Sequence, residues 1–227
     1  MPGPIYSITP FTLLDYPGKA ACIIWFAGCN MRCRYCYNPE IVLGKGREDV
    51  TEALAFLRSR RGLLEGVVLS GGECTLHRSI FPLLASIKEL GFFAKVDTNG
   101  SRPVVMQALV KQGLIDYVAL DFKAPEYRYS TVTQSNLFPA FIESLLLLMD
   151  AGIPFEVRTT VHCDLMGMEE LQAMVASLQN VGYRGNYYIQ HFVNNVPVLD
   201  RTLGRSSQLV NPERLSTKDI RVVLRRS

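Results

Sequence analysis

The sequence predicts an α/β protein built as a partial (β/α)6 barrel of the TIM type, with mainly parallel strands. Short apolar runs alternate with amphipathic segments of helical spacing, which is the pattern of repeated βαβ units. Most helical segments end at a glycine or an asparagine, as helix C-termini commonly do. Six such strands fit a partial barrel, because 227 residues are few for the eight strands of a full one. An open, doubly wound sheet is the alternative architecture.

The predicted elements follow one another in a regular order. The opening segment, 7–19, contains turn-forming prolines and a glycine, so we expect a short edge hairpin that leads into the first barrel strand. The barrel strands are expected at 20–27, 66–70, 92–96, 117–121, 153–161 and 187–192. The helices are expected at 48–60, 80–90, 103–112, 140–151 and 168–180. Crossover helices of this length make neighbouring strands parallel.

We expect one domain over residues 1–227, with an N-terminal hairpin at 1–19, a barrel core at 20–192 and a C-terminal tail at 193–227. The hydrophobic content of 48% is enough to build a sizeable core. The strand–helix pattern weakens after residue 192. Segment 200–216 is expected to be irregular, and 220–224 is a candidate for a last edge strand.

Charge and cysteine content limit the classes of function. The net charge of +3 is small, so neither nucleic acid nor a membrane surface is an expected partner. The N-terminus lacks the pattern of a signal peptide, and the most apolar helical segment, 137–149, is too short to span a bilayer. Six cysteines without an export signal indicate reduced thiols and metal binding. We therefore expect a cytoplasmic protein.

Three cysteines, Cys29, Cys33 and Cys36, stand at CxxxCxxC spacing directly behind the first predicted strand. Thiolates this close in sequence can face one centre if the loop wraps around it, and iron–sulfur clusters are usually held by thiolates. A four-iron cluster has four irons to ligate, so three cysteines would leave one iron open to an exogenous ligand. A structural zinc loop is the alternative, but such sites usually pair two CxxC-like halves, and the sequence has no second half.

With Tyr35 before the last cysteine, this loop resembles the signature of the radical S-adenosylmethionine (SAM) enzymes. The resemblance implies the radical SAM fold, SAM as a cofactor, and a [4Fe–4S] cluster held by the three cysteines. The sequence Gly71-Gly72-Glu73, after the second predicted strand, resembles the motif with which the family holds the methionyl ammonium of SAM. Paired glycines allow a close approach to a ligand, and a carboxylate can meet a cation. Cys74 is interpreted as a buried thiol.

The next two predicted strands end in motifs that resemble those of the glycyl-radical enzyme activases, DTNG at 97–100 and D-hydrophobic-K at 121–123. The resemblance implies that Lys123 meets the SAM carboxylate, and that the two aspartates and the threonine help to bind a monovalent cation. Two carboxylates at neighbouring strand ends do repel each other unless a cation or the lysine neutralises them. The alternative is a helix N-cap at Asp97 or Thr98 and a surface salt bridge at Lys123.

Strands five and six carry Arg158 and His191, and in the activases an arginine and a histidine from these strands reach the cofactor. Gln190 could serve in place of His191, because a lone histidine near an apolar strand is more often a core residue. By the resemblance, the cofactor-binding residues are Tyr35, Asn38, Gly71, Gly72, Glu73, Asp97, Thr98, Asn99, Asp121, Lys123, Arg158 and His191.

The DYPG sequence at 15–18 resembles the DGPG turn that activases place near their substrate, with Tyr16 in place of a glycine. This variant is similar to the subgroup of anaerobic ribonucleoside-triphosphate reductase activating proteins. The resemblance implies that Asp15 is a catalytic residue that contacts the protein substrate. Asp15 could equally cap its own turn.

Together these motifs imply an oxidoreductase that cleaves SAM reductively to a 5′-deoxyadenosyl radical and generates a glycyl radical on a partner enzyme, anaerobic ribonucleotide reductase or a related one. Segment 37–70 holds no cysteine, so we expect one cluster, with flavodoxin or ferredoxin as the electron donor. A radical SAM enzyme for a small molecule, similar to the deazaguanine synthases, is the second hypothesis. A non-catalytic metal-binding module is the third.

Overall fold

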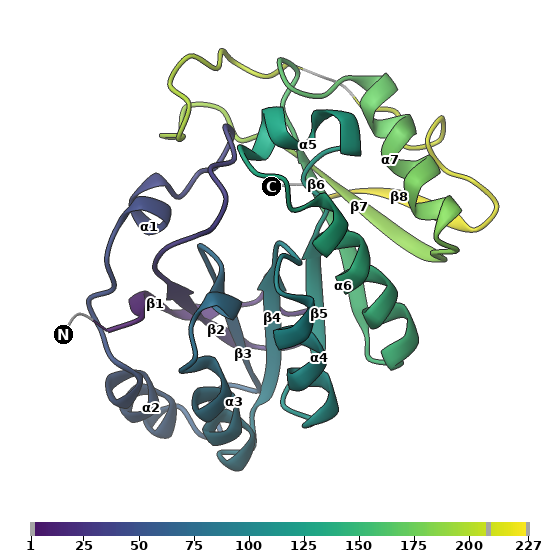
Figure 1. The fold of residues 1–227 in the computed structure, drawn as a ribbon. Coiled ribbons are helices and arrows are strands. Elements are labelled where there is room, and N and C mark those ends of the chain that lie inside the picture. Colours follow the sequence, from purple (N-terminus) through teal and green to yellow (C-terminus); the bar gives the residue numbers. More distant parts are fainter. Residues whose placement is uncertain (1–2, 208–209, 226–227) are drawn as a thin grey trace.

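The computed structural model describes residues 3–207 and 210–225 (Figure 1). The remaining positions of the predicted N-terminal segment and tail, 1–2, 208–209 and 226–227, lie outside the described residues. The described part of the chain forms one eight-stranded sheet in sequence order. Its strands are β1 Ile5–Thr12, β2 Ala21–Phe26, β3 Gly66–Gly71, β4 Phe93–Thr98, β5 Tyr117–Asp121, β6 Phe155–Val161, β7 Gly185–His191 and β8 Ile220–Arg225.

Strands β2 to β7 are parallel, and each pairs with the next one along the chain. This confirms the partial barrel, since a doubly wound sheet reverses its strand order at a switch point. The helices are α1 Pro39–Leu43, α2 Val50–Ser59, α3 Ile80–Glu89, α4 Pro103–Lys111, α5 Glu126–Thr133, α6 Phe138–Ala151 and α7 Met168–Asn180. In Figure 1 the short helices α1 and α5 lie near the upper end of the sheet, apart from α2, α3 and α4 beside its lower part.

The two edges of the sheet show where the sequence prediction was incomplete. The edge hairpin expected at 7–19 is present in another form, because its first strand is β1 and its second strand is the first barrel strand β2 itself, with which β1 pairs antiparallel. The first residue of β1, Ile5, pairs with Phe26, the last residue of β2, and both are buried. Apolar side chains therefore hold the two strands together at the end of the hairpin that lies away from its turn. At the other edge the candidate strand is confirmed as β8, which runs parallel to β7.

Two short helices were not predicted. Helix α5 is rich in polar and β-branched residues, which have low helix propensity, and its N-cap is Pro125. Helix α1 begins with Pro39 at its first turn, a position that suits proline. Both follow the strands that end in candidate site residues, so their placement shapes the site.

The two faces of the barrel strands have different surroundings. On β4, Ala94 and Val96 belong to the apolar core that packs against the helices, whereas Lys95 and Asp97 point into the barrel. Successive side chains of a strand alternate in this way. At the N-terminal ends of the strands, Tyr16 closes the barrel together with apolar residues of β2 and β3. The interior is therefore accessible from the C-terminal ends of the strands.

Within the described residues, no single helix has the length and apolar content needed to cross a membrane; α5 and α6 meet that criterion only when counted together, and they are bent by 113°.

Candidate active site

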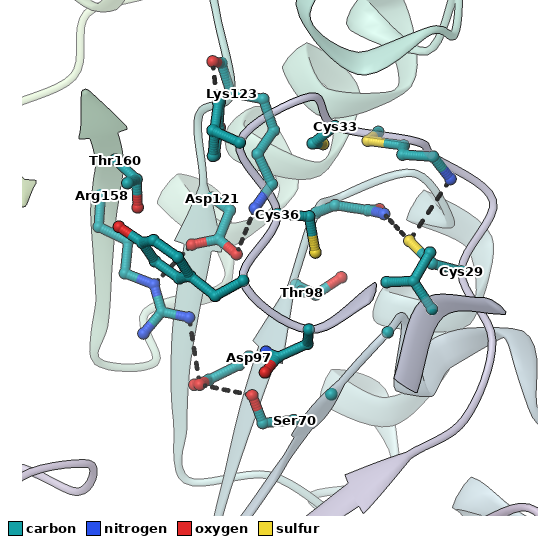
Figure 2. A pocket seen from close by; sticks show the side chains of 18 of the residues that line it. Cys29, Cys33, Cys36, Ser70, Asp97, Thr98, Asp121, Lys123, Arg158 and Thr160 are labelled. Carbon is teal, nitrogen blue, oxygen red and sulfur yellow. Dashed lines mark hydrogen bonds and ion pairs between the residues drawn. The ribbon is translucent and has the colours of Figure 1, made fainter. Parts of the chain in front are cut away.

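A cavity lies at the C-terminal ends of the parallel strands, between the cysteine loop and the strand ends (Figure 2). It gathers most of the residues that the sequence singled out. The predicted site residues that line it are Asp15, Cys29, Cys33, Tyr35, Cys36, Asn38, Gly71, Gly72, Asp97, Thr98, Asn99, Asp121, Lys123 and Arg158. Glu73 and His191 are not among the described residues that line it.

The cysteine loop is held in place by backbone hydrogen bonds at both of its flanks. Gly28, with a positive φ of 82°, turns the chain at the end of β2, and its N–H donates to the carbonyl of Ile41. Further along, the N–H groups of Arg32 and Arg34 donate to carbonyls in the last turn of α5, at 2.9 and 3.0 Å. The three sulfur atoms consequently face one space (Figure 2).

The donor set fits an iron–sulfur cluster better than zinc. All three candidate ligands are thiols, and iron–sulfur clusters are usually held by cysteine thiolates. A structural zinc site is closed by four protein ligands. The described residues around the loop supply no fourth cysteine, because Cys74 lies in the core.

Burial favours the protonated form of two of the three thiols. It raises the pKa of the Cys29 thiol, and it raises that of Cys33 to about 12, although the Lys123 ammonium acts in the opposite direction on both. A metal group binds thiolates and must displace these protons. Loading of the loop is therefore expected to release protons and to be favoured at higher pH.

The two glycines after β3 are required by close packing against the cysteine loop. A Cβ atom on Gly72 would lie 1.8 Å from the carbonyl oxygen of Gly28, and Gly71 has a φ of +117°. The N–H of Gly72 donates to Phe26, and that of Glu73 to Gly28, both at 2.9 Å. The predicted close approach is thus present, and it joins this turn to the start of the cysteine loop.

The side chain of Glu73 is engaged within the protein and does not line the cavity. Its carboxylate is buried and accepts four hydrogen bonds, from the hydroxyl and N–H of Thr75, the hydroxyl of Thr98 and the N–H of Asn99, at 2.5 to 3.1 Å. Burial raises the pKa of Glu73, and these donors counteract part of that rise. Because the four donors occupy the carboxylate, Glu73 ties the turn after β3 to the DTNG segment, and backbone groups of the two glycines face the cavity instead.

An alternating chain of charges crosses the ends of β4, β5 and β6. Lys95 Nζ contacts Asp97 at 2.6 Å, and Arg158 contacts Asp97 at 3.1 Å. The same guanidinium contacts Asp121 at 2.5 Å, and Lys123 Nζ contacts Asp121 at 2.9 Å. These three cations and two carboxylates together carry one net positive charge. Lys123, the last member of this row of charged side chains, lies beside the cysteines (Figure 2).

These ion pairs keep the side chains of Asp121 and Lys123 charged. Burial alone would raise the pKa of Asp121, but Arg158 and Lys123 outweigh it and hold the pKa at about 2. Burial lowers the pKa of Lys123, and Asp121 more than reverses this. Arg158, which lies between the two aspartates, already relieves the repulsion between their carboxylates.

Asn99 and Tyr35 connect neighbouring motifs of the site through hydrogen bonds. The amide of Asn99 donates to Cys29 Sγ at 3.8 Å and to Asn30 at 3.1 Å, so it turns toward the cysteine loop. The hydroxyl of Tyr35 donates to the carbonyl of Lys123 at 3.4 Å. Asn38 is the N-cap residue of α1 and lines the cavity.

At the ends of β6 and β7 the cavity is lined by one residue that the sequence offered as an alternative, Gln190, and by one that was not predicted, Thr160. Gln190 lines the cavity and His191 does not, because neighbouring side chains of a strand point to opposite faces. Thr160 pairs with Gln190 and lies two residues beyond Arg158 on the same face of β6. The period of two along each strand was the signal that could have identified Thr160 and Gln190.

Asp15 lines the cavity, and its carboxylate also accepts a hydrogen bond of 2.5 Å from the hydroxyl of Thr12. The geometry therefore accommodates both interpretations of this residue, a turn residue and a substrate contact. The next residue, Tyr16, is buried against Gly66 and Tyr117 and anchors the loop.

A second group of candidate ligands, His162, Cys163 and Asp164, lies beyond the end of β6. The His162 ring is already engaged within the protein: Nε2 pairs with the carbonyl of Gly204 at 3.0 Å, and Nδ1 accepts the N–H of Asp164 at 3.2 Å. These contacts explain the burial of His162 as part of the local fold.

The fold and the three-cysteine site have counterparts in one family. The model of the radical SAM superfamily matches residues 23–178, and the chain therefore belongs to this superfamily of enzymes. Relatives within it include glycyl-radical enzyme activating enzymes and, over a smaller share of the chain, the 7-carboxy-7-deazaguanine synthase of Haemophilus influenzae, which is 27% identical over 60% of this chain and 58% of its own length. A Methanocaldococcus jannaschii protein provisionally named as one is 31% identical over 83% of this chain and 79% of its own length. The pyruvate formate-lyase-activating enzyme of Clostridium pasteurianum is 33% identical over 79% of each chain.

Solved structures show the same fold. SuiB of Streptococcus suis, crystallised with bound S-adenosylmethionine, superposes with a TM-score of 0.66 at 13% identity. The match covers 89% of this chain and 51% of SuiB, so the chain spans about half the length of that protein. Membership of the superfamily implies SAM and an iron–sulfur cluster as cofactors.

Proposed function

We propose that this protein is an activase that generates a glycyl radical on a partner enzyme. One observation carries the proposal: three cysteines of one loop face a cavity at the strand ends that is also lined by the Lys123 ammonium. A cluster with one open iron fits the three cysteines, and the carboxylate of SAM fits the Lys123 ammonium. Three relatives named as activating enzymes match over 79% or more of this chain, whereas three 7-carboxy-7-deazaguanine synthases match over 60% or less, which favours an activase over an enzyme for a small molecule.

Each part of the cavity has a proposed role. Cys29, Cys33 and Cys36 would hold a [4Fe–4S] cluster, which when bound supplies one electron for the cleavage of SAM to methionine and a 5′-deoxyadenosyl radical. Lys123 would bind the SAM carboxylate, because its ammonium is held charged and lies beside the cysteines. The backbone at Gly71 and Gly72 would accept the methionyl ammonium.

The remaining predicted residues extend this site. Arg158 would fix Asp97 and Asp121 below the cofactor, and a monovalent cation at these carboxylates stays a prediction. Either Gln190 or His191 would contact SAM, and Gln190 is the one that lines the cavity. Asp15 would meet the substrate at the cavity wall.

The proposed partner is a glycyl-radical enzyme, with anaerobic ribonucleotide reductase as the first candidate. One cluster leaves the electron supply to an external flavodoxin or ferredoxin. We propose that residues 1–227 act as a single radical SAM domain. A cytoplasmic location remains our expectation, and it rests on the six cysteines, which are all free.

Anaerobic reconstitution tests the cofactor part of this proposal. Wild-type protein should bind about four irons per chain and, with SAM and dithionite, release 5′-deoxyadenosine. Cys33→Ala should lose both properties. Cys74→Ala is the matched control, because Cys74 is a buried thiol outside the loop, and it should retain them. Full iron content in Cys33→Ala, or iron loss in Cys74→Ala, would contradict the proposed ligand set.

A further inference from the structure

One aromatic side chain of the cavity wall has no part in the proposed function. Trp25, on β2, lines the cavity, whereas every other strand residue that lines it in the described part of the chain is polar or a glycine. Trp25 is half-buried, and it is the only tryptophan in the sequence. It therefore adds a single large apolar surface to the wall that the strands form.

Two sets of contacts hold the indole ring in place. Its Nε1–H donates to the hydroxyl of Thr9 on β1 at 2.8 Å, so the one polar atom of the side chain is paired within the protein. The ring also packs against the apolar cluster at the base of the barrel, which is formed by Tyr16, Ala21, Ile23 and Val68. The surface that Trp25 presents to the cavity is therefore apolar, and its position is set before a ligand binds.

The β1–β2 hairpin that carries Trp25 also carries Asp15, and both side chains line the cavity. Strand β1 holds both of them through threonine hydroxyls: that of Thr12 donates to Asp15 at 2.5 Å, and that of Thr9 accepts the indole N–H. The residues proposed to hold the cluster and SAM lie on other segments, in the cysteine loop and at the ends of β3 and β5. The hairpin thus gives the cavity an apolar ring and a carboxylate that can accept peptide N–H groups. These two groups suit a peptide segment that has no side chain at the point of contact.

We propose that Trp25 packs against the radical-bearing glycine of the partner enzyme and selects glycine over residues that have a side chain. This inference rests on the proposed function, in which the Cα–H bond of that glycine breaks and the hydrogen atom passes to C5′ of the 5′-deoxyadenosyl radical. Glycine has no Cβ, so its backbone can lie directly against a flat ring. A Cβ at the same position would have to displace the ring, which Thr9 and the apolar base hold. Trp25 is then a specificity-determining residue that touches the substrate.

Titration calorimetry of the metal-free, full-length protein measures this selection. The partner is the glycyl-radical enzyme on which the loaded wild type forms a radical, with anaerobic ribonucleotide reductase as the first candidate. A second form of that partner has alanine in place of the radical-bearing glycine. One methyl group in a fitted apolar contact changes affinity by about tenfold or more, so the wild type should prefer the glycine form by at least that factor.

The preference should disappear with the ring. In Trp25→Ala it should fall to about twofold or less, because the space left by the ring admits the methyl group of alanine. Trp25→Phe retains a ring and should keep the preference for glycine. Phe93→Ala is the control, since Phe93 is 43% exposed at the end of β4 away from the cavity, and it should behave as the wild type does.

The single tryptophan gives a direct readout of contact that needs no substitution by a smaller residue. Metal-free protein with 5-hydroxytryptophan in place of Trp25 can be excited at wavelengths where the tryptophans of the partner do not absorb. Binding of the partner should shield this residue from quenching by acrylamide, and SAM alone should not.

Three results would overturn the inference: equal affinity of the wild type for both forms of the partner, unchanged quenching when the partner is bound, or shielding by SAM alone, which would place the adenine of the cofactor on the ring. Failure of the proposed function has a different outcome, because the reconstituted wild type would then form no radical on anaerobic ribonucleotide reductase or on another glycyl-radical enzyme.

Discussion

The backbone N–H of Asn99 donates to the carboxylate of Glu73 at 2.7 Å, so that the loops after β4 and β3 are joined through a buried side chain. The cofactor motifs of two strands therefore form one unit. The carboxylate of Glu73, which the sequence assigned to SAM binding, holds these two loops together and does not line the cavity.

Glu73→Gln should consequently destabilise the protein as well as weaken SAM binding. The new amide NH2 group would face the N–H of Asn99 or Thr75, which cannot reverse its polarity as a hydroxyl can. Leaving one buried donor unpaired costs about 1–3 kcal/mol. Urea unfolding measures this loss, and Glu89→Gln on the exposed face of α3 is the control. Equal stability of Glu73→Gln and wild type would show that the four hydrogen bonds are not important for folding.

The ion pairs of Asp121 predict a defined pH dependence of stability. Arg158 and Lys123 hold its folded-state pKa at about 2, below the usual 3.8, so the folded state binds this proton less readily than the unfolded state. The contribution of Asp121 is therefore complete above about pH 4 and is lost as the pH falls toward 2. It amounts to roughly 2 kcal/mol.

Urea unfolding of the metal-free chain between pH 5 and pH 2 checks this window. Asp121→Asn should be less stable than wild type at pH 5, and the difference should shrink as the pH falls. Asp150→Asn on the exposed face of α6 should follow the wild-type curve. A constant difference between Asp121→Asn and wild type across the whole range would contradict the assigned charge state.

Lys123→Met should weaken SAM binding without removing the cluster. A charge-assisted hydrogen bond to the SAM carboxylate is worth roughly 1.5–3 kcal/mol, so the dissociation constant should rise at least about tenfold. Titration calorimetry on the reconstituted protein measures it. Lys111→Met, at the exposed end of α4, is the control. Unchanged affinity in Lys123→Met would place the carboxylate elsewhere in the cavity.

Asp15 separates substrate recognition from cofactor chemistry. A glycine has no side chain to recognise, so its loop must be bound through peptide groups, and a carboxylate can accept peptide N–H groups. Asp15→Asn should keep the cluster and uncoupled SAM cleavage while the yield of glycyl radical falls. Thr12→Val is the matched variant, because it removes the hydrogen bond within the turn and leaves the carboxylate. If Thr12→Val lowers the radical yield as much as Asp15→Asn does, Asp15 acts only through its turn.

The sequence predicted the barrel strands because their apolar runs are bounded by helices with clear termini, and it predicted the site because its motifs stand at consecutive strand ends. Helix α5 could not be predicted from its polar, β-branched sequence, since it is stabilised by packing on the cysteine loop. The position of Arg158 between Asp97 and Asp121 depends on how three strands align. The choice of Gln190 over His191 depends on which face of β7 points inward.

The direction of the Glu73 side chain also required the structure. A carboxylate after two glycines can point into the cavity or into the protein interior, and the sequence does not distinguish these two rotamers. The hydroxyl of Thr98 and the N–H of Asn99 behind it decide the outcome.

The most direct test of the central claim is an EPR measurement of the partner enzyme. Reconstituted wild-type protein, SAM, a reductant and its glycyl-radical partner, with anaerobic ribonucleotide reductase as the first candidate, should give the doublet of a glycyl radical. That signal should depend on SAM and be accompanied by one 5′-deoxyadenosine per radical formed. Deuteration of the partner's glycine at Cα should transfer deuterium into the 5′-deoxyadenosine. Rapid 5′-deoxyadenosine formation with no glycyl radical, and with deuterium transferred from a small molecule instead, would contradict the assignment as an activase.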